Sequence, residues 1–247
     1  MRPPELKICG MAAVRARFQA NPGSIARLYF DAPTSKRIGL MCRALAAARK
    51  IYRCVEPDEL ARVAGSVHHG GIVAVVAAPV PCAATAVEAA AWVRRRESVV
   101  VLDRIGNAHN LGAIVRTAAF FGVPHLAIAA DPAAAQPGEA AYRVAEGGFE
   151  FLQVWTVADV AAFLGLLTAA GFDVVGAATR GGALRPGKGR PAGPWALVLG
   201  NEERGLEPAV AAACTRLLTI PGGGRVESLN VSVAAAVLMH ELGRKGG

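Results

Sequence analysis

Residues 220–242 read IPGGGRVESLNVSVAAAVLMHEL, and the rest of the chain can be organised around them. The stretch begins like the end of a strand, passes through a proline and three glycines, and becomes apolar and helical in length from residue 231. Glycines let the backbone approach a ligand closely because no Cβ intervenes. Ser228 and Asn230 stand where a helix N-terminus takes side-chain caps and presents oriented N–H groups. Taken alone, the stretch is more typical of a turn and a capped core helix than of a binding site.

Two other stretches have the same form of a strand followed by a polar loop with glycines. They are VVVLDRIGNAHNLGAIVRTAAFFGV over residues 99–123 and WALVLGNEERGLEP over residues 195–208. Three such loops in this order resemble the three motifs of the SpoU/TrmH family of RNA ribose 2′-O-methyltransferases, within the SPOUT superfamily. The residues that carry the resemblance are Asn110, Gly112 and Arg116 in the first motif, Gly200, Asn201, Glu202, Gly205 and Leu206 in the second, and Ser228, Leu229 and Asn230 in the third.

The resemblance implies an enzyme that transfers a methyl group from S-adenosyl-L-methionine to a ribose 2′-hydroxyl in structured RNA. It also implies a parallel α/β sheet of the SPOUT type, a C-terminal trefoil knot that forms the cofactor pocket, and a homodimer with active sites completed near the dimer interface. The family's catalytic residues correspond to Asn110, Arg116, Glu202, Ser228 and Asn230. Its cofactor-binding residues correspond to Leu199, Gly200, Asn201, Gly205, Ile220, Ser228 and Leu229.

The chemistry of methyl transfer limits what these side chains can do. The protein must hold donor and hydroxyl in line and manage the proton of a weakly acidic alcohol. A guanidinium stays protonated in proteins, so we interpret Arg116 as a ligand for the developing alkoxide rather than as the base; the alternative is a surface arginine paired with an acid. Asn110 is interpreted as a cap of the helix expected over residues 112–121, as a hydrogen-bond partner of the ribose, or as both. Glu202 fits an acid–base or orienting role better than Glu203, which we expect to be solvated.

Three departures from the family pattern put the substrate in doubt more than the activity. Residues 107–108 are Asn-Ala where the first motif usually has Asp-Pro, and Gly222 replaces a methionine of the third motif. Residues 145–148 read AEGG where Ser-x-Gly-Ala is typical. None of these changes removes a main catalytic side chain.

Composition favours a soluble cytoplasmic enzyme. The chain has 247 residues, of which 53% are hydrophobic, yet it contains no run of about 20 apolar residues that would predict a membrane span. The N-terminus has scattered charges and no signal-peptide core. Five cysteines without a CxxC pair predict reduced thiols rather than disulfides or zinc. His68 and His69 have no third ligand at a helpful spacing, so we expect a turn rather than a metal site.

The positive charge lies in the first part of the chain. Residues 1–96 hold 15 Lys/Arg against 6 Asp/Glu, a net charge of +9, whereas residues 97–247 hold 12 against 13, a net charge of −1. A basic segment joined to a near-neutral one suggests that the first part meets a polyanion such as RNA. On charge alone, RNA binding is about as well supported as the alternative, a basic protein that binds no nucleic acid.

We expect an RNA substrate-binding domain over residues 1–78, a linker over 79–96 and the catalytic domain over 97–247. The first is a small α/β domain that resembles the ribosomal-protein-like domain of many family members. Its expected elements are helices over 10–20, 35–50 and 55–64 and strands over 25–30 and 72–78. The catalytic domain alternates strands and helices, which implies a parallel doubly wound sheet. Its expected strands are 99–102, 125–130, 151–154, 174–177, 195–199 and 217–220, with helices over 112–121, 157–170 and 231–242.

Ligands bind beyond the carboxyl ends of strands in such sheets, and all three motifs fall at those ends. Two basic segments, residues 94–96 and 180–190, have two open interpretations each. They either touch RNA phosphates or are solvated, the first as a helix end and the second as a loop.

Three functions compete. The favoured one is a ribose 2′-O-methyltransferase that acts on rRNA rather than tRNA, because minimal tRNA-modifying relatives often lack the first domain. The alternative is a catalytically inactive RNA-binding protein that keeps the fold, against which stand the five retained catalytic residues. A dinucleotide-dependent enzyme is disfavoured because no GxGxxG follows the strand at residues 99–102.

Overall fold

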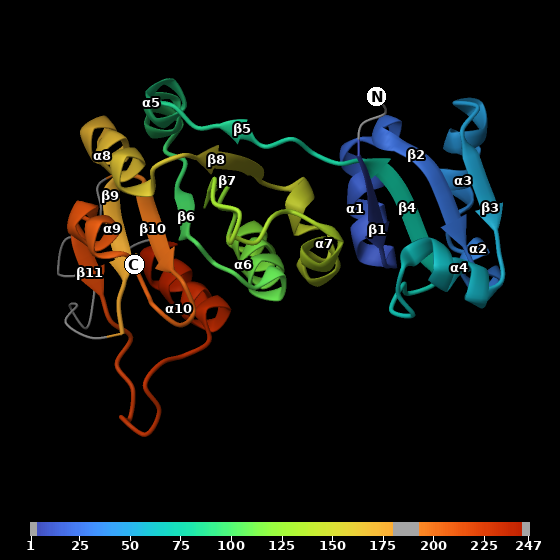
Figure 1. The fold of residues 1–247 in the computed structure, drawn as a ribbon. Coiled ribbons are helices and arrows are strands. Elements are labelled where there is room, and N and C mark those ends of the chain that lie inside the picture. Colours follow the sequence, from blue (N-terminus) through green and yellow to red (C-terminus); the bar gives the residue numbers. More distant parts are fainter. Residues whose placement is uncertain (1–3, 180–192, 244–247) are drawn as a thin grey trace.

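The computed structural model describes residues 4–179 and 193–243, which form a small lobe and a large lobe (Figure 1). The small lobe holds a four-stranded sheet of order β1-β4-β2-β3. Its β1 and β2 pair antiparallel with β4, and β3 pairs parallel with β2. The strands are β1 (Glu5–Cys9), β2 (Ile25–Phe30), β3 (Ile51–Cys54) and β4 (Ile72–Ala77). The helices are α1 (Met11–Ala20), η1 (Pro22–Ser24), α2 (Ala32–Ser35), α3 (Gly39–Ala47) and α4 (Pro57–Ala64).

The central strand β4 is buried on both faces, as its β-branched run predicts. Ile72, Ala74 and Val76 belong to the apolar cluster that includes α1 and α3, while Val73 packs in the cluster that includes α4. The helix expected over residues 35–50 is shorter than predicted, because α3 begins at Gly39 and ends at Ala47. The side chain of Asp31 caps α2 by accepting a hydrogen bond from Thr34 N at 2.9 Å, and α2 ends before a new helix begins.

The large lobe holds a seven-stranded sheet of order β11-β9-β10-β6-β7-β8-β5 in which every pair is parallel. The strands are β5 (Cys82–Ala83), β6 (Val99–Asp103), β7 (His125–Ala129), β8 (Gln153–Val157), β9 (Asp173–Ala177), β10 (Trp195–Gly200) and β11 (Arg216–Leu218). The helices are α5 (Ala86–Arg95), α6 (Ala108–Phe120), α7 (Glu139–Ala145), η2 (Gly148–Glu150), α8 (Val160–Ala170), α9 (Pro208–Ala213) and α10 (Val231–Gly243).

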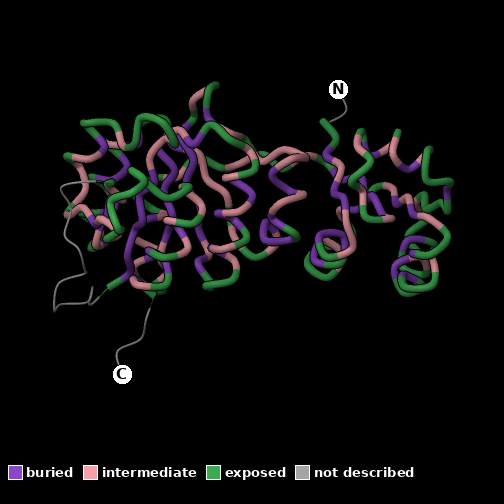
Figure 2. The backbone as a smooth tube through the Cα atoms, turned by 90° about the horizontal axis from the view of Figure 1, so that it is seen from below, coloured by how far each residue is buried: buried purple, intermediate pink, exposed green. Residues whose placement is uncertain are grey.

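Alternating residues of β6 divide the core into two layers. Val100 and Leu102 join the apolar cluster that includes α6, α7 and α10. Val99 and Val101 join the cluster that includes α5, α8 and α9. In Figure 2 the buried segments run through both lobes, with exposed residues along the outer helices. The expected parallel α/β sheet covered on both faces is confirmed.

Residues 82–96 are an integral part of the large lobe rather than the linker expected over 79–96. β5 pairs with β8 at the edge of the sheet, and α5 begins with a capping box between Thr85 and Glu88. Trp92 is 1% exposed and lies in the core of the lobe. The prolines and alanines of this segment suggested a connector, but the buried face of α5 makes it structural. Residues 180–190, the second basic segment, lie outside the described residues.

The two lobes meet where α1 packs against α7 and η2. Arg17 Nη2 lies 2.9 Å from Glu150 Oε1, and both side chains are largely buried. Gly147 adopts a φ of 94°, and an added Cβ would lie 2.6 Å from Ala16 Cβ. The next residue, Gly148, packs on α6, where an added Cβ would lie 3.1 Å from the Cα of Arg116. Two consecutive glycines therefore let this segment lie close to α1 on one side and close to α6 on the other.

A buried histidine, His125, lies at the start of β7 and is expected to make stability depend on pH. His125 Nε2 lies 2.9 Å from Glu97 Oε2, Trp155 Nε1 donates to His125 Nδ1 at 3.3 Å, and Trp92 stacks on the imidazole. Burial lowers the pKa of His125 and outweighs the opposing effect of Glu97. For Glu97, burial acts to raise the pKa, but hydrogen bonds from His125 and Arg95 outweigh it and leave the pKa below its usual value.

The unfolded chain therefore binds a proton at His125 below about pH 6.5, while the folded chain resists it. We expect the melting temperature to fall as the pH drops from 7 to 5, because the unfolded chain takes up a proton at His125. It should fall further at lower pH, where the unfolded chain protonates Glu97 more readily than the folded chain does. His125→Gln keeps a donor and an acceptor but does not titrate, so it should flatten the profile between pH 5 and 7. The matched exposed variant, His109→Gln, should leave the profile unchanged. An unaltered profile in His125→Gln would contradict this assignment.

Candidate functional site

The first two motifs meet because their strands are neighbours. β6 and β10 pair in parallel, and their last residues, Asp103 and Gly200, are direct partners in the register. The chain turns sharply after Gly200 through reciprocal backbone hydrogen bonds between Asn201 and Gly205, at 3.0 and 2.8 Å. A Cβ on Gly200 would lie 2.2 Å from the carbonyl carbon of Gly205, so only glycine fits there. The resemblance implies that Gly200 binds the cofactor; the neighbours that require a glycine here are the backbone atoms of its own turn, in Gly205 and Leu206.

Asn201 holds this turn against the first motif. Its Oδ1 accepts from the backbone N–H groups of Glu203 and Arg204 at 3.1 and 3.2 Å. Its Nδ2 donates to the carbonyl oxygen of Arg104 at 2.9 Å. Since the side chain is used within the protein, Asn201 positions the loop in the structure described here.

Glu202 is the centre of the site. Its carboxylate accepts from Gly106 N at 3.1 Å, from Asn107 N at 3.2 Å and from Asn110 Nδ2 at 2.9 Å. Burial acts to raise the pKa of Glu202, but the hydrogen bonds from Asn110 and the backbone outweigh it and leave the pKa below its usual value. A carboxylate so stabilised is a weak base, which favours the orienting role over the acid–base role.

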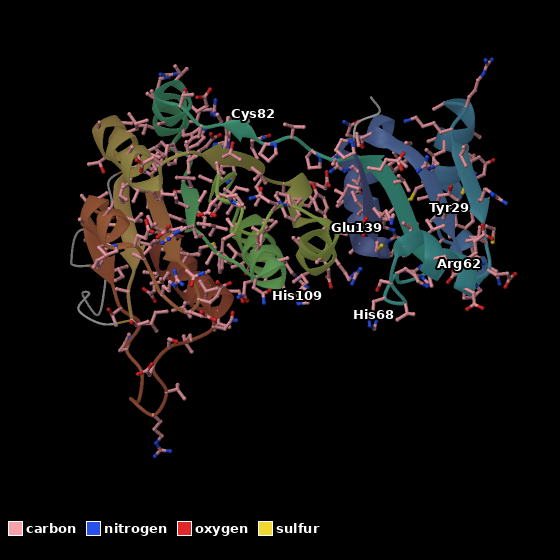
Figure 3. The ribbon with its side chains drawn as sticks, in the orientation of Figure 1. Tyr29, Arg62, His68, Cys82, His109 and Glu139 are labelled. Carbon is pink, nitrogen blue, oxygen red and sulfur yellow. The ribbon has the colours of Figure 1, made fainter. Side chains whose placement is uncertain are left out.

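Asn110 connects all three motifs. While its Nδ2 donates to Glu202, its Oδ1 accepts from Asn230 Nδ2 at 3.0 Å. Asn230 in turn caps α10, because its Oδ1 accepts from Ser232 N at 2.9 Å. Residues 110, 202 and 230 thus form one chain of hydrogen bonds between segments more than 90 residues apart. Figure 3 marks this region with His109 at the N-terminal end of α6.

Of the two interpretations of Asn110, the structure contradicts the helix cap. α6 begins at Ala108, and its cap is Asn107, whose Oδ1 accepts from His109 N at 2.8 Å and from Asn110 N at 3.3 Å. Asn107 is one of the residues that depart from the Asp-Pro of the family. Asparagine is a strong N-cap, so the departure preserves the helix start. Because Asn107 caps the helix, the side chain of Asn110 is available to hydrogen-bond Glu202 and Asn230.

Sequence reasoning also missed Asp103 and Arg104. Asp103 is 1% exposed; its Oδ2 accepts from Glu207 N at 2.9 Å and its Oδ1 lies 3.0 Å from Arg104 Nε. Arg104 has a φ of 58° and also pairs with the carboxylate of Glu207. An aspartate after four apolar strand residues was the available signal, because a buried carboxylate needs partners. Asp103 and Arg104 thus join the first motif to the second through their contacts with Glu207.

The structure does not bring Arg116 or Ser228 into the network. Arg116 Nη2 lies 3.1 Å from Glu146 Oε2, and both side chains are more than half exposed. Within one chain, Arg116 therefore matches the second interpretation given above, a surface arginine paired with an acid. Ser228 is exposed, and the structure records no hydrogen bond between it and the other described residues.

The predicted cofactor residues lie at the ends of two strands and in the loop that leads into α10. Leu199 is buried, Ile220 half-buried and Leu229 46% exposed. Residues 221–230 are all exposed and extend from the large lobe (Figure 1). The exposed Leu229 and the half-buried Ile220 offer apolar surface that fits a nucleoside, and the carboxylate of Glu202 fits a cationic group. The residues present therefore suit the cofactor that the sequence predicts.

Within the described residues, no three His, Cys, Asp or Glu side chains are grouped so as to hold a metal ion. Across the same residues, no helix combines the length and the apolar character that crossing a bilayer requires.

Two family models match the chain. The SpoU rRNA Methylase family matches residues 97–240, and the family described as RNA 2′-O ribose methyltransferase substrate binding matches residues 7–81. The second match covers most of the small lobe, and the first covers the large lobe from β6 to α10.

Individual proteins agree with these matches. YfiF of Escherichia coli O157:H7, an uncharacterized tRNA/rRNA methyltransferase, is 34% identical over 247 residues that cover 99% of this chain and 69% of YfiF. RlmB of Nitrosomonas europaea, a 23S rRNA (guanosine-2′-O-)-methyltransferase, is 30% identical over 96% of this chain and 91% of RlmB. The SpoU methyltransferase AviRb of Streptomyces viridochromogenes, solved in complex with AdoMet, superposes with a TM-score of 0.75 at 23% identity, over 97% of this chain and 89% of AviRb. The AviRb match shows the shared fold, and with the model match over residues 97–240 and the YfiF match it establishes that the chain belongs to the SpoU rRNA methylase family of RNA methyltransferases.

Proposed function

We propose that the protein methylates a ribose 2′-hydroxyl in structured RNA, with S-adenosylmethionine as donor and rRNA as the favoured substrate. The observation that carries the proposal is the hydrogen-bonded chain Glu202–Asn110–Asn230, which joins all three motifs at the carboxyl ends of parallel strands. The names of RlmB and AviRb support ribose methylation, rRNA and AdoMet. The basic N-terminal part, with residues 1–78 as the RNA-binding domain, supports a polyanionic substrate.

In the proposed reaction the ribose 2′-oxygen attacks the methyl carbon, the bond from that carbon to sulfur breaks, and the hydroxyl proton is lost. S-adenosylmethionine supplies an activated methyl group whose leaving group is a neutral thioether. Glu202 fixes the loop at Gly106 and Asn107 and orients Asn110, which with Asn230 directs amide groups toward the ribose. A nearby phosphate or water takes the proton, because Glu202 is a weak base.

Arg116 is proposed to stabilise the developing alkoxide in a homodimer. It lies one helical turn from Phe120 on the same face of α6. Phe120 is 82% exposed, and Phe121, Val233 and Val237 extend this apolar surface over α6 and α10. A second copy packed on this surface would bring its own Arg116 close to the first copy's site. This arrangement supports an active site made by two chains, and we further propose the trefoil knot of the family for the C-terminal region.

Sedimentation tests the dimer. We expect the protein to sediment as a dimer at micromolar concentration and Phe120→Glu to sediment as a monomer, because a charge buried in an apolar interface is costly. Phe151→Glu is the matched control, since Phe151 is 64% exposed and lies outside α6 and α10. A wild-type protein found only as monomer would contradict the proposal.

Calorimetric titration with S-adenosylmethionine, with and without unmodified rRNA, tests the function itself. Binding should be followed by ribose methylation of 23S rRNA transcripts in preference to tRNA transcripts. The reaction would take place in the cytoplasm, which agrees with five free cysteines. No binding in either condition would favour the inactive RNA-binding alternative.

A further inference from the structure

A cavity of about 270 Å³ lies at the junction of the two lobes, away from the three motif loops. The first turn of α1 and the loop before β4 line it from the small lobe, including His68 and Gly70. Arg143, in the C-terminal half of α7, and Glu146, the residue directly after α7, line it from the large lobe. Figure 3 labels His68 and Glu139 on the two sides of this junction.

Arg143 is the unusual member of this lining. Its Nε is buried without a hydrogen-bond partner. The Nε of Arg17 is in the same state, but the guanidinium of Arg17 pairs with Glu150, whereas the structure records no ion pair of Arg143 with any described residue. Buried donors without acceptors are rare and costly, and more so on a cation. The side chain therefore lacks an anionic partner.

The N-terminus of α1 adds donors to the same cavity. This helix of 10 residues begins after Gly10, which has a φ of 91° and no side chain to cap it, and its first turn contains no acid. The backbone N–H groups of Met11, Ala12 and Ala13 have no acceptor within the helix, and the helix dipole favours negative charge there. Together with Arg143, these groups form a donor set suited to a phosphate.

The acidic and thiol groups of the lining do not cancel this preference. The carboxylate of Glu146 is already paired with Arg116 at 3.1 Å. Burial raises the pKa of the Cys9 thiol, so it is uncharged at neutral pH. The positive charge of Arg143 and the positive end of the α1 dipole are therefore not neutralised by the other groups that line the cavity.

We propose that this cavity binds a backbone phosphate of the substrate RNA, held by Arg143 and the first turn of α1. The site rests on the proposed function and extends it, because it assigns an RNA contact to the junction of the lobes. RNA bound there would touch both lobes at once, on the side where Glu146 holds Arg116.

Arg143→Gln tests the site by fluorescence anisotropy with a labelled 23S rRNA transcript across a salt series. We expect about tenfold weaker binding at 0.1 M salt, and a slope of log K against log salt smaller by about 0.7–0.9, as for one lost phosphate contact. Arg15→Gln removes the same charge from the exposed side of α1, outside the cavity, and should change affinity less than twofold. Equal affinities for Arg143→Gln and Arg15→Gln would overturn the proposal.

Ala12→Asp provides a second variant in case Arg143→Gln folds poorly. An acid in the first turn should stabilise α1 through the helix dipole, yet it places a negative charge in the cavity and should weaken RNA binding. A higher melting temperature with weaker RNA binding supports the site, whereas unchanged RNA affinity overturns it. Competition with inorganic phosphate distinguishes an RNA phosphate from free phosphate as the ligand. If inorganic phosphate binds the protein but leaves RNA affinity unchanged, the proposed RNA site is overturned. S-adenosylmethionine titration is independent of the cavity, so failure of the proposed function is recognised separately.

Discussion

Replacing Arg116 with alanine is expected to slow methyl transfer by roughly 10²–10³-fold, the usual effect of removing a group that stabilises a developing oxyanion. Arg116 is the only permanent cation among the five predicted catalytic residues. Its pair with Glu146 is exposed, and such pairs contribute only about 0–1 kcal/mol to folding. The variant should therefore keep its melting temperature and its affinity for S-adenosylmethionine.

Single-turnover transfer of labelled methyl groups at saturating RNA measures this effect, and calorimetry measures cofactor binding. Glu146→Gln is the companion variant, because it releases Arg116 without removing it and should keep transfer close to the wild-type rate. If Arg116→Ala methylates RNA as fast as the wild type, the catalytic assignment is wrong. Loss of cofactor affinity in the same variant would instead assign Arg116 to the cofactor pocket.

Replacing Glu202 with glutamine is expected to slow transfer by about a hundredfold, because misplacement of reacting groups by about 1 Å has effects of that size. The carboxylate accepts from Gly106 N, Asn107 N and Asn110 Nδ2. Glutamine has one acceptor oxygen and one donor NH₂ group, so at least one of these donors would face another donor. The loop and the amide of Asn110 would then lose their fixed positions.

Glu203→Gln is the matched control, since Glu203 is the exposed neighbour in the same turn, and it should not change the rate. Mixing the two inactive variants tests whether the site is shared. If Arg116 acts on the partner's Glu202 site, random mixed dimers of Arg116→Ala and Glu202→Gln should regain about a quarter of wild-type activity, because half the dimers have one intact site. No recovery would place Arg116 and Glu202 in the same chain's site.

The meeting of the three motifs could be predicted from the sequence because parallel strands present their carboxyl ends at one edge of the sheet. Glu202, Asn110 and Asn230 are joined there by hydrogen bonds. Which side chain caps a helix could not be predicted so well. Asn107 and Asn110 are equally good caps by residue type, and the choice depends on where the backbone leaves β6.

Other parts of the fold lacked a local signal. All four residues of β3 are exposed, so this edge strand has no alternation of apolar and polar residues. The pairing of Arg17 with Glu150 depends on how the lobes meet, and that of Arg116 with Glu146 depends on how α6 and α7 pack within the large lobe; no periodicity records either. The role proposed for Arg116 involves a second chain, and no local pattern in the sequence records such a contact.

The two glycines at the junction have a consequence for which nucleotide is modified. Gly147 packs on α1 and Gly148 on the backbone of Arg116, so α1 of the small lobe and α6 of the large lobe are separated by a span of two residues. Under the proposed function, an RNA bound by the small lobe would present to the three motifs only the ribose that lies at the matching distance. Larger residues at Gly147 or Gly148 would clash with Ala16 or with the backbone of Arg116, and would therefore change the distance between α1 and α6 that sets which ribose is reached.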